Sequence, residues 1–170
     1  MFLSGIADEA GSAIETQVKA HRELGWSHIE IRNVQGTQLT LVDDPTFEHI
    51  YKTVTEAGLT VSCFASGIAN WATSITRDPE PVYDELRRAI PRMHRFGTKY
   101  IRIMSFPNDK DNPVGEPEWR AEAIKRVRTL VRMAEDGGVV LVHENCSGWG
   151  GTSAENNLNL IEEIATSHSE

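Results

Sequence analysis

The sequence predicts an α/β fold with a parallel sheet, and three features of the chain predict it. Short apolar runs rich in β-branched residues alternate five times with longer segments whose apolar residues recur at helical spacing. A glycine follows four of these helical segments, at the point where a left-handed residue commonly ends a helix. A proline preceded by an acidic residue opens three of them. Strands and helices that alternate in this way pair in parallel through right-handed crossovers, which gives the order (βα)5.

Each element is expected from its local pattern. The expected strands are residues 2–7, 28–33, 59–64, 99–104 and 139–144. The expected helices are residues 13–24, 45–57, 79–96, 117–136 and 154–165. In the fourth helix the apolar residues fall on one face because they are spaced by three or four, as at Ile124, Val127, Leu130 and Val131.

The expected helix boundaries carry residues that satisfy the free backbone groups of a helix end. Two capping boxes are expected, Ser12 with Glu15 and Thr152 with Glu155, in which hydroxyl and carboxylate accept from backbone amides. Proline takes the first helical position at Pro45, Pro79 and Pro117. The left-handed residues at the helix ends are expected to be Gly25, Gly58, Gly97 and Gly137.

Composition limits the class of protein. The chain has 170 residues, of which 39% are hydrophobic, and this is enough for one domain with a buried core. Its net charge of −8 lowers the expectation of nucleic-acid binding. No apolar run approaches the roughly 20 residues of a membrane span, and the start of the chain has no secretory pattern. The two cysteines, Cys63 and Cys146, fit a reduced cytoplasm better than a disulfide framework.

Two architectures compete within the α/β class. A doubly wound sheet is complete with five strands, whereas a (β/α)8 barrel needs roughly 250 residues, so that this chain would supply five of its eight units. Strand polarity favours the barrel. Ile29 and Ile31 fall on one face of the second strand, and Glu30 and Arg32 fall on the other. Charged residues on a parallel sheet are expected at the solvated carboxyl ends of barrel strands, although an edge strand with one wet face remains the alternative.

Four segments carry a resemblance to a known family. They are GIADEA at residues 5–10, LGWSHIEIR at residues 24–32, AGLTV at residues 57–61 and VLVHEN at residues 140–145. In their order and spacing they resemble the xylose isomerase-like TIM-barrel superfamily, a group of sugar phosphate isomerases/epimerases, inosose dehydratases and endonuclease IV-type proteins. The resemblance runs over nearly the whole chain. It implies a partial (β/α) TIM barrel, with residues 1–170 as a single domain of five βα units and the last three units absent.

The resemblance also implies a divalent metal, Mn, Mg, Co or Zn, held in the family by a glutamate after the fifth strand and by three further ligands on later strands. Only the first ligand has a match here, Glu144, which is the expected metal ligand and catalytic proton shuttle. The site is therefore expected to be incomplete in this chain. A strand-end glutamate that only caps the following loop is the plainer alternative for Glu144.

Five other residues are candidate substrate-binding residues: Glu30, Arg32, Arg102, Asn70 and Trp149. A salt bridge between Glu30 and Arg32, or between Glu30 and Arg102, would be a structural alternative. Trp71 and Trp149 follow strands, and each could form a sugar-binding wall or pack the core of its loop. Residues 148–153 could cradle an anion at the start of the fifth helix, but they match no nucleotide-binding motif, and a flexible loop is the better interpretation.

The expected function is a cytoplasmic sugar (phosphate) isomerase/epimerase that moves a proton next to a carbonyl with the help of a metal. An inosose-dehydratase-type lyase would use the same site. An endonuclease role is third, because the acidic chain lacks a basic groove. A non-catalytic partial barrel that binds a ligand or another chain is the alternative from a different class. The expected ligand is a sugar or cyclitol, with no nucleic acid or membrane partner, and a homo-oligomer is possible because the outer strands leave unpaired edges.

Overall fold

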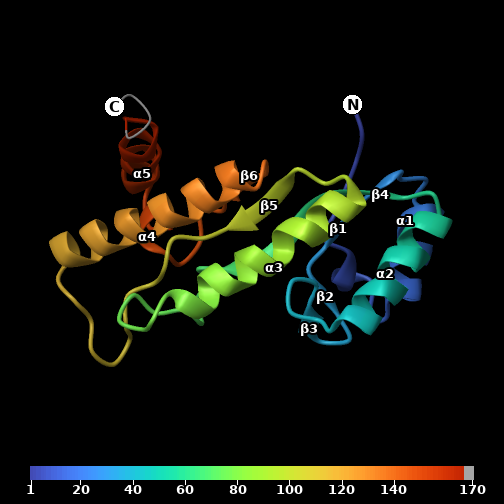
Figure 1. Ribbon diagram of the computed structural model, residues 1–170, viewed down its shortest axis with the longest axis horizontal. Helices are drawn as coiled ribbons and strands as arrows, with labels where there is room; N and C mark the ends of the chain where they lie inside the picture. The colour runs from blue at the N-terminus through green and yellow to red at the C-terminus, as the bar shows by residue number, and fades with distance from the viewer. Residues whose placement is uncertain (167–170) are drawn as a thin grey trace. The chain divides into compact units, whose positions relative to one another are not determined.

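The computed structural model describes residues 1–166 (Figure 1). Its helices are α1 Ile14–Glu23, α2 Asp44–Glu56, α3 Glu80–Phe96, α4 Glu116–Asp136 and α5 Ala154–Thr166. Its strands are β1 His28–Ile31, β2 Asn33–Val34, β3 Thr37–Gln38, β4 Thr60–Ile68, β5 Tyr100–Ile103 and β6 Val140–His143. Two short 3-10 helices cover Ala7–Glu9 and Trp149–Gly151. None of the helices in residues 1–166 combines the length and the apolar character needed to cross a bilayer.

The main sheet confirms the α/β class. Its strand order is β1-β4-β5-β6, and β1 pairs with β4 in parallel. Each strand therefore lies beside the preceding one along the chain, with a helix between them, and the order never reverses. A doubly wound sheet needs such a reversal, whereas a barrel adds its strands in sequence. The topology is that of a partial (β/α) barrel.

The alternation expected along the strands is also confirmed. In β1 the side chains of Ile29 and Ile31 are buried, while Glu30 between them is half-buried. In β5 the buried residues are Ile101 and Ile103. Strand β6 differs, because neither of its faces is fully covered. It ends the strand order of the sheet in the described residues, which accounts for its partial exposure.

The chain forms two compact units. Unit 1 comprises Met1–Ser66 and Arg88–Ile101, and unit 2 comprises Gly67–Arg87 and Arg102–Glu170. In unit 1, α1 packs against α2, and in unit 2, α4 packs against α5 (Figure 1). The boundary falls within α3, β4 and β5, so these three elements contribute residues to both units.

The expected first strand, residues 2–7, is wrong as a strand. It is reduced to one parallel bridge between Ile6 and Glu30, with the Glu30 amide donating to the Gly5 carbonyl oxygen at 3.0 Å. Phe2 and Leu3 are 59% and 57% exposed. Apolar character alone therefore did not make a strand here: Phe2 stacks on His28, at 3.8 Å between ring centroids, but both Phe2 and Leu3 stay more than half exposed.

Some boundary residues also differ from expectation. The N-cap of α1 is Ala13, with no capping side chain, so the capping box of Ser12 and Glu15 is not formed. At α5 the cap is Ser153 rather than Thr152, since the Ser153 hydroxyl accepts from the Asn156 amide at 3.0 Å. After α4 the left-handed residue is Gly138, one position later than expected. Gly25, Gly58 and Gly97 have positive φ, as predicted.

A short hairpin was not expected from the sequence. Strands β2 and β3 pair antiparallel, with Asn33 opposite Gln38 and Val34 opposite Thr37. Gln35 and Gly36 between them both have positive φ, which a two-residue turn of this type requires. The glycine was the only local signal, since the strands are too short for an alternating pattern to be seen.

Candidate active site at the carboxyl ends of the strands

The loops that follow β4, β5 and β6 are hydrogen-bonded to one another within unit 2. The Ile75 amide donates to the Pro107 carbonyl oxygen at 2.8 Å, and the Phe106 amide donates to the Ala69 carbonyl oxygen at 3.0 Å. The Glu144 amide donates to the Ile103 carbonyl oxygen at 2.9 Å. Carboxyl ends of parallel strands in a barrel form its functional face. These bonds give that face a fixed backbone.

Two residues of this face hold a strained backbone conformation. Ala69, after β4, and Phe106, after β5, have φ of 58° and 55°, and both side chains are fully buried. A non-glycine residue in the left-handed region costs of order 1 kcal/mol or more and persists only where its surroundings enforce it. Such strain is concentrated at functional sites, so it supports the assignment of function to these loops.

Glu144 and Arg102 are brought together at the end of the sheet. Arg102 Nη1 lies 3.3 Å from Glu144 Oε2, and the two side chains are 15% and 39% exposed. Glu144 Oε2 is itself buried and accepts no hydrogen bond. Oε2 is therefore held against Arg102, and because the Glu144 side chain is 39% exposed, the rest of the carboxylate is the part that a substrate could reach. The sequence placed both residues at the carboxyl ends of barrel strands, but it predicted no pair between them.

His143 points to the opposite side of β6 from Glu144. Its Nε2 lies 3.1 Å from the Ser105 hydroxyl oxygen, which also accepts from the Gly150 amide at 2.9 Å. Burial lowers the pKa of His143, against the opposing influence of Asn157 and Glu144. The histidine is thus a packing residue under α5, as its place in the strand predicted.

The glycine-rich loop after β6 makes close contacts and hydrogen bonds with the rest of unit 2. Gly148 lies so close to Ser105 that a Cβ on it would stand 2.4 Å from the Ser105 carbonyl carbon. A Cβ on Gly151 would stand 1.9 Å from the Cys146 carbonyl oxygen. The Gly150 and Gly151 amides already donate within unit 2, to the Ser105 hydroxyl and to the Gly148 carbonyl oxygen. These glycines permit close backbone approach, and two of the amides expected to cradle an anion are occupied.

Asn70 and Trp149 both hold the loops in place. The Asn70 side-chain oxygen accepts from the Ala72 amide at 2.9 Å and forms a local turn. The Trp149 indole is 1% exposed, and its Nε1 donates to Glu116 at 3.0 Å. Trp149 therefore packs the interior of unit 2, whereas Trp71 is the exposed indole of these loops.

Glu30 and Arg32 belong to unit 1. Arg32 Nε donates to both carboxylate oxygens of Asp8, at 3.0 and 3.1 Å, and Arg32 Nη2 donates to Glu9 at 2.6 Å. The hydrogen bond to Asp8 is the main cause that raises the pKa of Arg32. Asp8 also accepts from the Asn33 side chain at 2.7 Å. Sequence reasoning missed Asp8 as the partner of Arg32 because the two are 24 positions apart.

The residues present do not make a metal site on their own. Within residues 1–166 there is no group of three or more His, Cys, Asp or Glu side chains placed to hold an ion. The buried, unbonded Oε2 of Glu144 could supply one oxygen ligand, but the Arg102 guanidinium beside it opposes a cation held by that oxygen alone. A divalent ion needs several oxygen or nitrogen ligands at once. The described chain supplies one of them.

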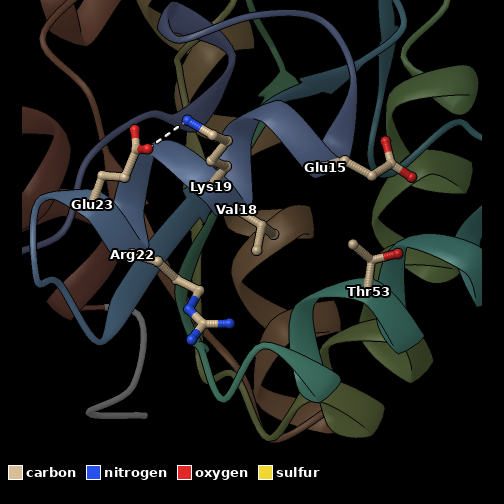
Figure 2. A pocket seen from close by; sticks show the side chains of 6 residues that line it. All are labelled: Glu15, Val18, Lys19, Arg22, Glu23 and Thr53. Atoms are coloured by element: carbon tan, nitrogen blue, oxygen red, sulfur yellow. Dashed lines mark hydrogen bonds and ion pairs between the residues drawn. The ribbon is translucent and has the colours of Figure 1, made fainter.

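A hollow of about 490 Å³ lies between α1 and α2 (Figure 2). It is lined by Glu15, Val18, Lys19, Arg22, Glu23 and Thr53. Figure 2 shows Lys19 paired with Glu23, and Glu15 is paired with His49 at 2.7 Å. The groove lies on helix flanks, away from the strand ends, and most of its charges are already neutralised. It is not the candidate active site.

The strand order and the polar residues at the strand ends define a protein of the parallel α/β-barrel class. Comparison with known proteins identifies the family. A family model described as Xylose isomerase-like TIM barrel matches residues 18–169, and the chain belongs to this family. A search of curated proteins gave no match.

Solved structures of this fold resemble the chain closely. A xylose isomerase-like TIM barrel protein from Mycobacterium smegmatis, in complex with magnesium, has a TM-score of 0.69 at 19% identity and covers 94% of this chain. The 3-keto-D-glucoside 4-epimerase YcjR from E. coli has a TM-score of 0.72 at 16% identity and covers 97%. The probable 3-DHS dehydratase AsbF from Bacillus anthracis has a TM-score of 0.70 at 16% identity and covers 97%.

The match covers only part of each of these structures. The chain spans 57% of the mycobacterial protein, 65% of the epimerase and 60% of the dehydratase. At such identities the similarity establishes the fold. It agrees with a partial barrel.

Proposed function

We propose that this chain carries the Glu144 half of a sugar isomerase or epimerase active site, which moves a proton on the carbon next to a carbonyl. The observation that carries the proposal is the Glu144–Arg102 pair at the carboxyl end of a barrel sheet, in which the Glu144 side chain stays 39% exposed. Epimerases among the similar structures support this reaction class. Glu30 and Arg32 remain proposed substrate-binding residues from unit 1.

Each of the two residues has a defined task in this proposal. Glu144 accepts the proton at a carboxylate oxygen. In an isomerisation the same carboxylate delivers it to the neighbouring carbon. In an epimerisation a second acid on the opposite face of the sugar, which the Glu144–Arg102 pair does not supply, has to return it. Removal of that proton leaves negative charge on the former carbonyl oxygen of the substrate. The Arg102 guanidinium, held beside Glu144, stabilises this charge, and stabilisation of a developing oxyanion is worth several kcal/mol in a dry site.

A divalent metal is part of the proposal, with Glu144 as one ligand. The similar mycobacterial structure contains magnesium. Bound metal would polarise the substrate carbonyl. The other ligands have to come from outside the described residues, because these supply no complete set.

Exchange of substrate hydrogen with D2O tests the proton transfer directly. With D-fructose or D-allulose, with and without added Mn²⁺, we expect the wild-type protein to exchange the hydrogen beside the carbonyl, observed by ¹H NMR. The exchange without metal reports the Glu144–Arg102 pair alone. Glu144→Gln should slow this exchange by about 100-fold or more, because an amide is a poor base. Glu155→Gln, an exposed glutamate of α5, is the matched control and should leave the rate unchanged. A Glu144→Gln protein with near-normal exchange excludes Glu144 as the base.

Dehydration is the second candidate, favoured by the similarity to the dehydratase. It begins with the same proton abstraction but ends with loss of water. Formation of an unsaturated product from a cyclitol ketone, with Glu144 still required, would assign the chain to this reaction instead.

A further inference from the structure

A cavity of about 460 Å³ lies on the loops that follow β4, β5 and β6, all within unit 2. Its lining includes Trp71, Arg77, Asp109, Lys110, Asp111 and Ser147. Ser147 stands three positions after Glu144, so the cavity extends from the same strand ends that carry the proposed reactive centre. Its volume is within the usual range for a small-molecule site.

The wall of this cavity is held in place by Asp109. One carboxylate oxygen accepts from the Ser74 and Thr76 hydroxyls, at 3.1 and 2.7 Å, and ties together the loops after β4 and β5. The other accepts from the Asp111 and Asn112 amides, both at 3.0 Å. These bonds lower the pKa of Asp109 to about 2, so the carboxylate stays ionised at neutral pH. The cavity is therefore preorganised without a ligand.

The groups that remain available suit an uncharged polyhydroxyl ring. The Trp71 indole is 61% exposed and offers an apolar face. Among the described residues, no ion pair engages Arg77, Lys110 or Asp111. Arg77 Nη1 donates to the Ala72 carbonyl oxygen at 3.4 Å, and the Lys110 and Asp111 side chains can donate to or accept from hydroxyl groups. The two positive charges are balanced by Asp109 and Asp111, which does not favour a phosphate or another anion.

We propose that this cavity is a subsite for a second sugar ring, stacked on Trp71 and hydrogen-bonded by Lys110 and Asp111. The substrate class of the chain is then a neutral glycoside rather than a free monosaccharide. This inference rests on the proposed function for its reactive end. It adds that the substituent next to the reacting sugar is itself recognised.

Binding measured without metal separates this subsite from catalysis. Tryptophan fluorescence and saturation-transfer NMR are recorded for maltose, cellobiose and trehalose, and for D-glucose and D-fructose. We expect at least one disaccharide to bind about fivefold to tenfold more tightly than the monosaccharides. Trp71→Ala and Lys110→Ala should each reduce this advantage. Both side chains are exposed, so neither variant should disturb folding. Phe2→Ala, which removes an exposed aromatic of unit 1, is the matched control and should retain it.

Three results overturn the subsite: equal affinity for disaccharides and monosaccharides, an unchanged preference in Trp71→Ala, or no binding of any of these sugars. Glu144→Gln distinguishes the two proposals. If this variant keeps both the disaccharide preference and normal D2O exchange, the proposed function fails while the subsite stands. If exchange depends on Glu144 but no sugar preference depends on Trp71, the subsite fails alone.

Discussion

Polar side chains at the strand ends differ in what holds them. Glu144 keeps a carboxylate oxygen without a hydrogen bond, whereas the Asp109 carboxylate accepts four. The first arrangement leaves capacity for chemistry, and the second fixes a loop. Sequence alternation was sufficient to place Glu144, because a strand sets side-chain direction every second residue. It could not identify Asp109, whose hydroxyl partners, Ser74 and Thr76, come from a loop more than 30 positions away.

The role of Asp109 gives a pH dependence of stability. Its pKa in the folded protein is about 2, below the ordinary value of 3.8, so the unfolded chain binds the proton more readily. Its stabilising contribution is therefore complete above pH 3.8 and is lost as the pH falls towards 2. We expect Asp109→Asn to unfold with a weaker pH dependence in this window than wild type. Urea unfolding monitored by circular dichroism measures this, with Asp136→Asn as control. Parallel pH profiles for wild type and Asp109→Asn would contradict the assignment.

At the scale of elements, the five helices were predicted to within about two residues, whereas the first strand and the hairpin β2–β3 were not. Helices carry their signal locally, in apolar spacing and in end residues such as Gly25 and Gly58. A strand forms only where a partner and a cover exist, which a local pattern does not reveal. Phe2 and Leu3 have strand-like composition, yet both are exposed.

At a helix end glycine is needed for its positive φ, whereas in the loop after β6 it is needed because there is no space for a side chain. At Gly148 the φ is −79°, which any residue adopts, but the Ser105 backbone occupies the space of a Cβ. We expect Gly148→Ala to destabilise the protein by about 2 kcal/mol or more, because the added Cβ would force the Ser105 backbone and the loop that carries residue 148 apart. Gly115→Ala is the matched control, since its Cβ would meet only Pro117 at 4.0 Å. Its cost should stay within about 1 kcal/mol, the loss expected at an N-cap. Equal unfolding midpoints in urea would refute the close-approach argument.

For the molecule as a whole, the sequence predicted the parallel α/β class and the partial barrel, because strand order follows from regular βα alternation. The chain spans 57% to 65% of the similar structures. The metal-ligating residues that the rest of a barrel would supply could therefore not be predicted from it. Strand β6 ends the order of the described sheet.

Exposed apolar residues lie on both β6 and α5 of unit 2. They are Val140 and Val142 on β6, and Leu158 and Ile161 on α5, with exposures of 43% to 61%. An unpaired strand edge with apolar side chains favours pairing with another chain.

We expect sedimentation velocity to show concentration-dependent association of the wild-type chain at tens of micromolar, roughly the range where exposed apolar edges associate. Leu158→Glu combined with Ile161→Glu should shift the population towards monomer, because it places two like charges in the contact. Leu24→Glu in unit 1 is the matched control, since Leu24 and Leu158 are both 61% exposed. If this control dissociates the assembly equally, association reflects general exposure of apolar residues rather than the β6–α5 edge. A wild-type chain that remains monomeric over the whole range shows that this edge needs no partner.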